Sequence, residues 1–170
     1  MTKEDFIPKP TPKLRSSLGI KRLSIDARTG FHGTMVSIEV VYLGELRTEA
    51  LHGPSRSTIR TDAPLDNCGK GELFSPTDLV SAALGTCVLT ILGIYAQKHG
   101  LNVSGASASV EKEMTAVPVR RISRLTTKLK IPISSETPHR DAIERAILSC
   151  PVHASLHPKM DKPIVFVWEP

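Results

Sequence analysis

The stretch Ser75–Gly100, SPTDLVSAALGTCVLTILGIYAQKHG, decides the fold of this chain because it predicts one long apolar helix. Ser75 is a preferred N-cap residue, Pro76 suits the first helical position, and Asp78 stands where a capping-box carboxylate stands. Apolar residues then recur at three- and four-residue spacing, at Val80, Leu84, Cys87, Ile91 and Ile94. Further apolar residues widen this stripe until most of the helix surface is apolar. We therefore expect a helix that ends at Gly100 and is covered by protein on nearly all sides.

Strand patterns lie on both sides of this helix. The β-branched stretch 34–51, the turn signal HGPS and the stretch 56–62 predict a hairpin. The stretches 103–114, 120–133 and 163–169 predict three further strands. Together with a second helix before the last strand, this order predicts an α+β fold with helices packed on antiparallel sheet.

The second helix is expected to begin at Thr137–Pro138, where a capping residue precedes a proline. Its apolar stripe consists of Ala142, Ile143, Ala146, Ile147 and Cys150. Pro151 follows immediately, and proline lacks the N–H that a helix interior needs. The helix is therefore expected to kink or break at Cys150.

Length and composition predict a single soluble domain. The 170 residues are 40% hydrophobic and 23% charged, which is ordinary for a globular protein. We expect a basic N-terminal extension over residues 1–33, with at most a short strand near Leu23–Ala27, and one domain over residues 34–170. The extension lacks the apolar core of a secretory signal, and we interpret it as a solvated arm; docking to an acidic partner is the alternative.

The charge pattern speaks against nucleic-acid and membrane partners. The formal net charge of +5 is small, and no basic run interleaved with aromatic residues is present. The uncharged run Leu79–Gln97 is close to the length of a membrane span, but its serine, threonine and glycine residues favour a core helix. We expect a cytoplasmic protein in which a second copy of the chain covers the apolar helix, that is, a homodimer.

Three cysteines in 170 residues do not make a disulfide framework. Taken singly, Cys87 and Cys150 are typical of small buried hydrophobic residues. Both lie on apolar stripes that must face the same core, however, so their thiols could lie close enough to bond. Cys68 stands in a polar loop beside glycine, and we interpret it as incidental.

A nucleophilic cysteine must be ionised, which requires a helix N-terminus or a nearby cation. Cys87 stands 12 residues after Ser75, or about 18 Å along the helix axis, so the dipole of its own helix cannot help. A cation must come from elsewhere, and Arg56 and Arg60 are the nearest candidates in the preceding strand segment.

A metal site is the competing hypothesis for Cys150. Cys150, His153 and His157 follow the spacing C-x2-H-x3-H, and the two histidines would share a helical face. A closed zinc site needs four ligands, and no partner motif such as C-x2-C is present. We therefore expect no metal, with His153 partly buried and His157 exposed.

Three stretches together resemble the OsmC/Ohr family of hydroperoxide-reducing proteins: FSPTDLVSAALGTC, RRISRL and CPVHASL. The resemblance covers about residues 35–169. It implies a tightly intertwined homodimer of α+β subunits, with the Cys87 helix central and buried and with active sites at the interface. It also implies that Cys87 is the peroxidatic cysteine, Cys150 the resolving cysteine, and Arg60 the arginine that holds the thiolate.

The implied reaction is the reduction of an organic hydroperoxide to an alcohol, in defence against oxidative stress. Cys87 becomes a sulfenic acid, Cys150 condenses with it to a disulfide, and an external dithiol reduces that disulfide. In the family this dithiol is often a lipoylated protein. The resemblance implies no cofactor.

One residue departs from the family pattern. Members with efficient peroxidase activity carry a glutamate ten positions before the first cysteine, paired with the arginine, and this chain has Thr77 there. Asp78 is turned away from that position by about 100°. We place Thr77, Asp78 and His153 in the substrate pocket or around the reactive groups. The alternative function is a dimer with little or no catalysis that binds a hydrophobic small molecule; the retained cysteine pair argues against it.

Overall fold

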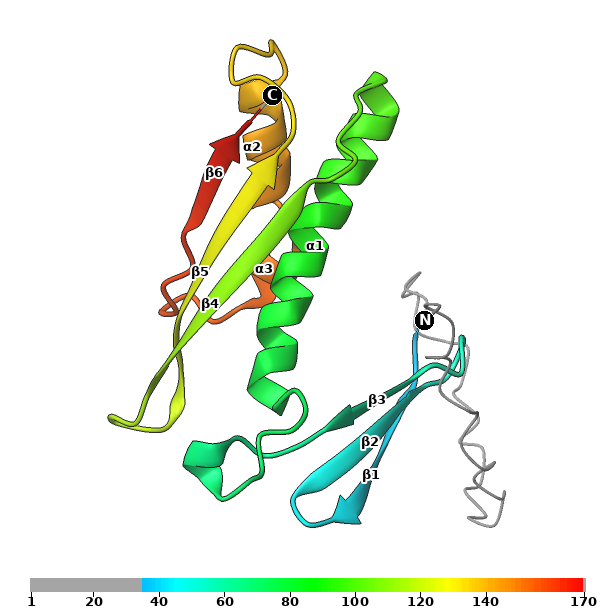
Figure 1. Cartoon of the computed structure of the whole chain (residues 1–170), viewed down its shortest axis with the longest axis vertical. Helices are drawn as coiled ribbons and strands as arrows, with labels where there is room; N and C mark the ends of the chain where they lie inside the picture. The colour runs from blue at the N-terminus through cyan, green and yellow to red at the C-terminus, as the bar shows by residue number, and fades with distance from the viewer. Residues whose placement is uncertain (1–34, 170) are drawn as a thin grey trace, which may run out of the picture. The chain divides into compact units, whose positions relative to one another are not determined.

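The computed structural model describes residues 35–169, which form two three-stranded sheets and three α-helices (Figure 1). The elements are β1 (Ile38–Gly44), β2 (Arg47–His52), β3 (Thr58–Thr61), α1 (Pro76–His99), β4 (Ser107–Thr115), β5 (Arg121–Ile131), α2 (Arg140–Leu148), α3 (Pro151–Ser155) and β6 (Ile164–Trp168). A short 3₁₀ turn, Leu65–Asn67, lies between β3 and α1. The predicted α+β class is confirmed. The expected extension over residues 1–33, with its strand near Leu23–Ala27, lies outside the described residues.

The first sheet has the order β1-β2-β3, with both pairs antiparallel. The prediction of one strand over residues 34–51 was wrong, because a two-residue turn at Glu45 and Leu46 splits it into β1 and β2. Both turn residues have left-handed backbones, with φ of 50° and 61°, and the Leu46 N–H donates to the Tyr42 hydroxyl at 3.2 Å. Such turns favour Asn-Gly, and Glu-Leu carries no comparable signal.

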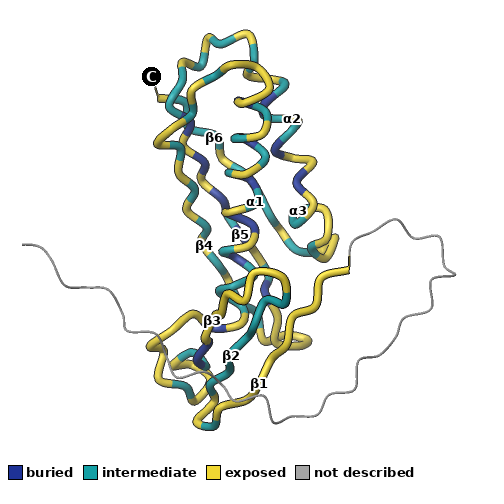
Figure 2. The backbone as a smooth tube through the Cα atoms, turned by 90° about the vertical axis from the view of Figure 1, so that its right-hand side faces the viewer, coloured by how far each residue is buried: buried dark blue, intermediate teal, exposed yellow. Residues whose placement is uncertain are grey.

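The second sheet has the order β4-β5-β6. The pair β4–β5 is antiparallel as expected, but β6 runs parallel to β5, which corrects the prediction of a purely antiparallel sheet. The chain passes through α2 and α3 between β5 and β6, and this is the long connection that a parallel pair requires. Along β5, buried Leu125, Leu129 and Ile131 alternate with exposed Lys128 and Lys130 (Figure 2). One face of this sheet therefore belongs to the core.

Helix α1 has the predicted ends. Its N-cap, Ser75, forms a complete capping box with Asp78, and Gly100 closes the helix with a φ of 66°. The helix packs against β4, β5, α2 and α3. Gly85 permits close approach of the sheet, because a Cβ placed there would lie 3.2 Å from a methyl carbon of Val110 on β4.

Within residues 35–169 of one chain, α1 is buried on one side only. Its buried row consists of Ser81, Leu84, Gly85, Val88, Leu92 and Ala96. A second row, Ala83, Thr86, Thr90 and Ile94, is exposed to solvent. The expected cover on nearly all sides is therefore not provided by residues 35–169 of one chain. By length and composition alone, α1 is the one helix of the described residues that could cross a membrane; its buried row packs as a core helix does.

The second predicted helix is divided as expected. It begins at Arg140 instead of Thr137–Pro138, because the Pro138–His139 segment forms a turn before the helix starts. It ends at Leu148, and the short α3 begins at Pro151. The predicted break at Cys150 is confirmed.

Candidate functional site

Cys87 and Cys150 are joined by a disulfide that links α1 to the end of α2. Their Cα atoms lie 6.3 Å apart, within the usual range for a disulfide. The local sequence explains this position of Cys150. Pro151 ends the run of helical hydrogen bonds, so Cys150 has an extended backbone (φ −51°, ψ 127°) as the N-cap residue of α3. The structure thus brings together Cys87 and Cys150, each of which was predicted on the apolar stripe of its helix.

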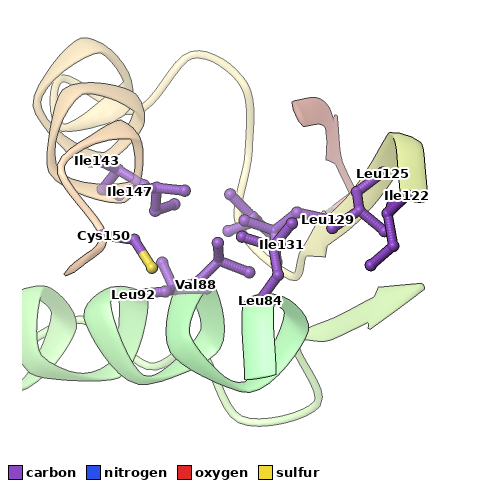
Figure 3. Packing of buried hydrophobic residues seen from close by; sticks show 10 residues of the cluster. All are labelled: Leu84, Val88, Leu92, Ile122, Leu125, Leu129, Ile131, Ile143, Ile147 and Cys150. Carbon is purple, nitrogen blue, oxygen red and sulfur yellow. The ribbon is translucent and has the colours of Figure 1, made fainter. Parts of the chain in front are cut away.

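The disulfide lies in the main hydrophobic cluster of the described residues. Cys150 is fully buried, whereas Cys87 is partly exposed. Figure 3 shows Cys150 pointing toward α1, near Val88 and Leu92. Ile143 and Ile147 of α2 belong to the same cluster and are both fully buried. Hydrocarbon therefore surrounds the Cys150 sulfur.

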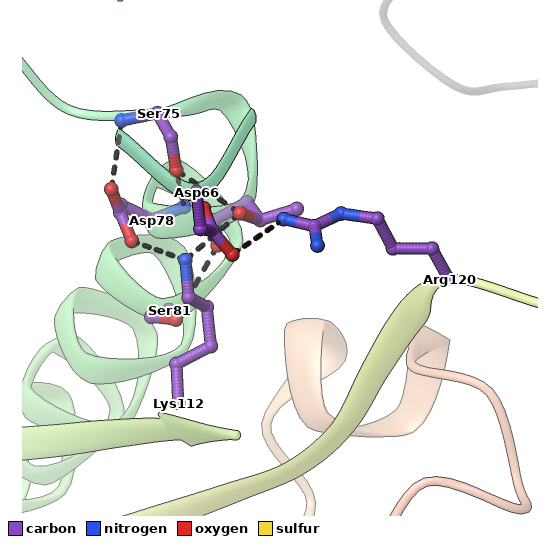
Figure 4. Close-up of polar contacts among 7 residues, drawn as sticks. Asp66, Ser75, Asp78, Ser81, Lys112 and Arg120 are labelled. Carbon is purple, nitrogen blue, oxygen red and sulfur yellow. Dashed lines mark hydrogen bonds and ion pairs between the residues drawn. The ribbon is translucent and has the colours of Figure 1, made fainter. Parts of the chain in front are cut away.

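A separate polar cluster lies at the N-terminus of α1 (Figure 4). Lys112 of β4 donates to the Asp78 carboxylate and, at 2.9 Å, to the Thr77 hydroxyl. Asp78 also accepts from the Ser75 N–H at 2.8 Å. Burial alone would raise the pKa of Asp78, but the hydrogen bonds from Lys112 and Ser75 outweigh it and hold that pKa below its usual value.

This cluster is distant from the disulfide. Thr77 and Cys87 are ten residues apart on one helix, a separation of about 15 Å along the axis. Lys112, which the sequence did not single out, is the cation bound to Thr77. The position where the family resemblance places a glutamate is thus occupied by a hydroxyl that accepts from a lysine.

Arg60 lies on β3 and is 54% exposed. Its Nε donates to Glu49 of β2 at 2.7 Å, so within one chain its partner is Glu49 and not Cys87. The predicted role of Arg60 stays a prediction. Arg56, the other candidate, is exposed in the turn before β3.

A second arginine forms a network that sequence reasoning missed. Arg47, at the start of β2, pairs with Glu72 and lies 3.7 Å from the fully buried Asp62. The Glu72 N–H donates to Asp62 at 3.1 Å, and this bond, with further backbone donors and Arg47, holds the pKa of Asp62 below its usual value. The network ties β2 to the loop before α1, and no periodicity in the sequence could have revealed it.

Cys150, His153 and His157 do not form a metal site in the described part of the chain. His153 is half-buried in α3, with Nε2 3.3 Å from the Lys162 carbonyl oxygen, and His157 is exposed beyond the end of that helix. The expectation that both share a helical face was wrong, since α3 ends at Ser155. Within residues 35–169 no three metal-binding side chains converge.

Another histidine stabilises the helix pair. The Tyr95 hydroxyl lies 3.0 Å from Nδ1 of His139, the N-cap residue of α2, and the Tyr95 ring stacks on His99. Because Cys150 follows the other end of α2, that helix is tied to α1 near both of its own ends, by a hydrogen bond at one and by the disulfide at the other. No sequence pattern indicated the first contact.

An apolar cavity of about 740 Å³ lies between α1, β4 and the loop before α1. Its wall includes Phe74, Ala82, Leu89 and Val110, with Lys112 among the polar lining residues. The cavity lies on the side of α1 away from Cys87, because Ala82 and Leu89 are turned by more than about 100° from the cysteine.

Comparison with known proteins gives the family. The sequence profile of the OsmC-like protein family matches residues 69–161, more than half of the chain. The chain belongs to the OsmC-like family. A solved structure from Psychrobacter arcticus 273-4, provisionally described as an osmotic stress induced and detoxification response protein, is 39% identical in sequence. That match covers 81% of this chain and 99% of that chain with a TM-score of 0.73.

Two more distant OsmC-like folds are also similar. An organic hydroperoxide resistance protein OsmC from Legionella pneumophila is 14% identical, covers 79% of this chain and 97% of its own, and has a TM-score of 0.63. An organic hydroperoxide resistance protein from Elizabethkingia anophelis is 13% identical, with 79% and 97% covered and a TM-score of 0.64. At these identities the likeness shows the fold alone. None of the curated proteins matches the chain in sequence.

Proposed function

We propose that this OsmC-like protein acts in the response to peroxide stress, by reducing organic hydroperoxides with the Cys87–Cys150 pair. The observation that carries the proposal is the disulfide between the two helices, in a cluster where one sulfur is partly exposed. Two proteins of the same fold are named for organic hydroperoxide resistance, which supports it further. We propose a cytoplasmic location as well. The proposed reaction starts from reduced thiols, and the cytoplasm keeps thiols reduced.

The reaction divides into two steps. The Cys87 thiolate attacks the distal oxygen of ROOH and the O–O bond breaks. The OH group passes to the sulfur, so that Cys87 becomes a sulfenic acid, and the RO⁻ leaving group takes a proton from water to become ROH. The Cys150 thiol then attacks the Cys87 sulfur, forming the disulfide and releasing water. The apolar residues around the pair, including Ile91, Ile143 and Ile147, favour a substrate with a hydrocarbon group over hydrogen peroxide.

The proposal includes a homodimer. The exposed row of α1 carries no charge, and Ile94 in that row is 58% exposed. Strand β1 has exposed apolar residues on both faces: Ile38, Val40, Val41, Tyr42 and Leu43. A surface this apolar on a soluble monomer marks an interface. A second copy of the chain is the partner that we propose. In such a dimer the Arg60 of one copy could lie near the Cys87 of the other.

The first experiment is a thiol count with a disulfide map after one molar equivalent of cumene hydroperoxide is added to the reduced protein. We expect a Cys87–Cys150 bond and a free Cys68, and a rate higher than with hydrogen peroxide by about tenfold or more, since buried methylenes contribute binding energy. Cys87→Ser should abolish the reaction, and Cys150→Ser should leave a sulfenic acid that dimedone traps. Cys68→Ser is the control and should react normally. Three intact thiols would refute the proposal for this substrate.

The role of Arg60 needs its own test. Arg60→Gln removes the charge and should lower the second-order rate of Cys87 oxidation by about a hundredfold, the range seen when a positioned ionic group is removed. Arg56→Gln is the matched control, because that arginine is exposed and four residues away. Equal rates for both variants would remove Arg60 from the site.

One observation favours the alternative, a dimer that binds a hydrophobic small molecule. The cavity beside α1 is mostly apolar and includes Lys112 in its lining. Unreactive thiols together with saturable binding of a hydrophobic fluorescent dye, lost when Ala82 is replaced by Trp, would favour this function. Rapid oxidation of Cys87 would favour the peroxidase.

A further inference from the structure

The two sulfurs of the disulfide differ in their access to solvent. Cys150 has an exposed fraction of 0% and lies in the hydrophobic cluster with Ile143 and Ile147. Cys87 is only partly buried. A disulfide is reduced when a thiolate attacks one of its two sulfurs, and the rate depends on which sulfur the thiolate can reach. The two sulfurs of this bond are therefore not equivalent as targets.

The position of Cys87 on α1 explains its exposure. At 100° per residue, Cys87 lies within about 60° of Ala83, Thr90 and Ile94, three of the four members of the exposed row. These neighbours are uncharged, and all three are exposed. Within the described residues, Cys87 is therefore the more open of the two cysteines.

The direction of attack strengthens the difference. In thiol–disulfide exchange the incoming sulfur approaches along the line of the bond that breaks, opposite the leaving sulfur. For Cys87 this line leads away from Cys150, the leaving sulfur. For Cys150 the same line starts in the cluster that contains Ile143 and Ile147, both fully buried. An attack on Cys150 would thus require α2 to move first.

We propose that reduction of this disulfide is directional: the reducing thiolate attacks Sγ of Cys87, and Cys150 is the leaving group. The first thiolate of a dithiol bonds to the Cys87 sulfur, the Cys87–Cys150 bond breaks, and the Cys150 sulfur takes the electron pair and then a proton from water. The second thiol of the reductant then loses its proton. Its sulfur attacks the reductant's first sulfur, which is bound to Cys87 in the mixed disulfide. This step releases the Cys87 thiolate and the oxidised, cyclic reductant.

The order of release matters for the cycle, in so far as the proposed peroxidase function holds. Cys87 leaves the second exchange as a thiolate, the form that attacks a hydroperoxide. Cys150 meanwhile remains in its hydrocarbon surroundings, close to the sulfur that it must resolve. In the proposed homodimer the exposed row of α1 faces the partner, but a hydroperoxide must still reach Cys87 there, and the opening that admits it would also admit the reducing thiolate. Cys150 stays buried within its own chain.

The test uses full-length Cys68→Ser protein, oxidised with diamide so that it does not depend on peroxidase activity. The oxidised protein is mixed with the monothiol glutathione, quenched with acid after short times, alkylated and mapped by mass spectrometry. We expect glutathione on Cys87 and the alkyl group on Cys150, in roughly tenfold excess over the reverse pattern at the earliest times, because access selects the attacked sulfur. Glutathione mainly on Cys150, or equally on both, would overturn the proposal.

A pair of neighbouring variants tests the cause. Ile147→Ala opens the cluster behind Cys150 and should raise the share of glutathione found there. Leu148→Ala is the control, because Leu148 is 49% exposed and next in sequence. An unchanged share in Ile147→Ala protein that still folds, judged by circular dichroism, would show that burial does not set the direction. Because diamide forms the disulfide, a protein inactive toward hydroperoxides would still give a result, so the two proposals fail separately.

Discussion

The two faces of α1 are both uncharged and have different surroundings. The buried face has Leu84, Val88 and Leu92 against the second sheet, and the exposed face has Thr86, Thr90 and Ile94, with nothing in residues 35–169 over them. The exposed face is the more polar of the two, yet it still presents Ile94 and no charge. A helix with two such faces is suited to contacts with two different surfaces, one in its own chain and one in a partner.

The largest effect is expected on the buried face. Leu92 is 1% exposed, so Leu92→Ala removes buried hydrocarbon and leaves a cavity, and should lower the free energy of unfolding by about 2–5 kcal/mol. Thr90→Ala on the exposed face is the control, measured on the dissociated monomer in which this face is open, and should change it by less than about 0.7 kcal/mol, in the stabilising direction expected from helix propensity. Urea denaturation of both variants checks this. A similar loss for both would show that the two faces are equally buried.

The exposed face should control assembly. Ile94→Lys places a charge in the row that we propose as the dimer contact, and should raise the dimer dissociation constant by about a hundredfold or more, which corresponds to about 2.7 kcal/mol. Val165→Lys is the matched control, since Val165 is 48% exposed on β6 and lies in the same outward row as Lys128. Analytical ultracentrifugation distinguishes them. A dimer that persists with Ile94→Lys, or a monomeric native protein, would remove α1 from the interface.

What the sequence predicts well is local. Ser75, Pro76 and Asp78 act within one helical turn, so the start of α1 could be predicted from residue types alone. The break at Cys150 was predictable for the same reason, because the next residue is a proline. The turn at Glu45 and Leu46 was not, because its residue types do not indicate the left-handed backbone that they adopt.

What the sequence does not predict depends on distant segments. Lys112 binds Asp78 from 34 residues away, and Tyr95 contacts His139 from 44 residues away. Apolar periodicity could place both cysteines toward one core, but it could not show that Cys150 is the more buried of the two. For the same reason it could not tell the covered face of α1 from the exposed one, since neither carries a charge.

The smallest effect is expected at the N-terminus of α1, where Asp78 caps the helix. Asp78→Asn keeps the shape of the side chain but removes its ion pair with Lys112, and should lower the free energy of unfolding by about 1 kcal/mol at neutral pH, the usual value of a helix cap. Asp78 is 39% exposed, so solvent screening keeps this value small.

The pH dependence of that loss identifies its origin. The folded-state pKa of Asp78 lies below its ordinary value of 3.8, so its stabilisation is fully present above that pH and disappears as the pH falls through the lower, folded-state value. The difference between Asp78→Asn and the wild type should therefore be constant from neutral pH to about pH 5 and shrink below about pH 4. Asp141→Asn in the first turn of α2 is the control, because Asp141 is exposed and should show a smaller difference throughout. A loss at Asp78 that stays constant down to pH 2 would mean that the carboxylate charge contributes nothing, and that the cap acts through its neutral hydrogen bonds alone.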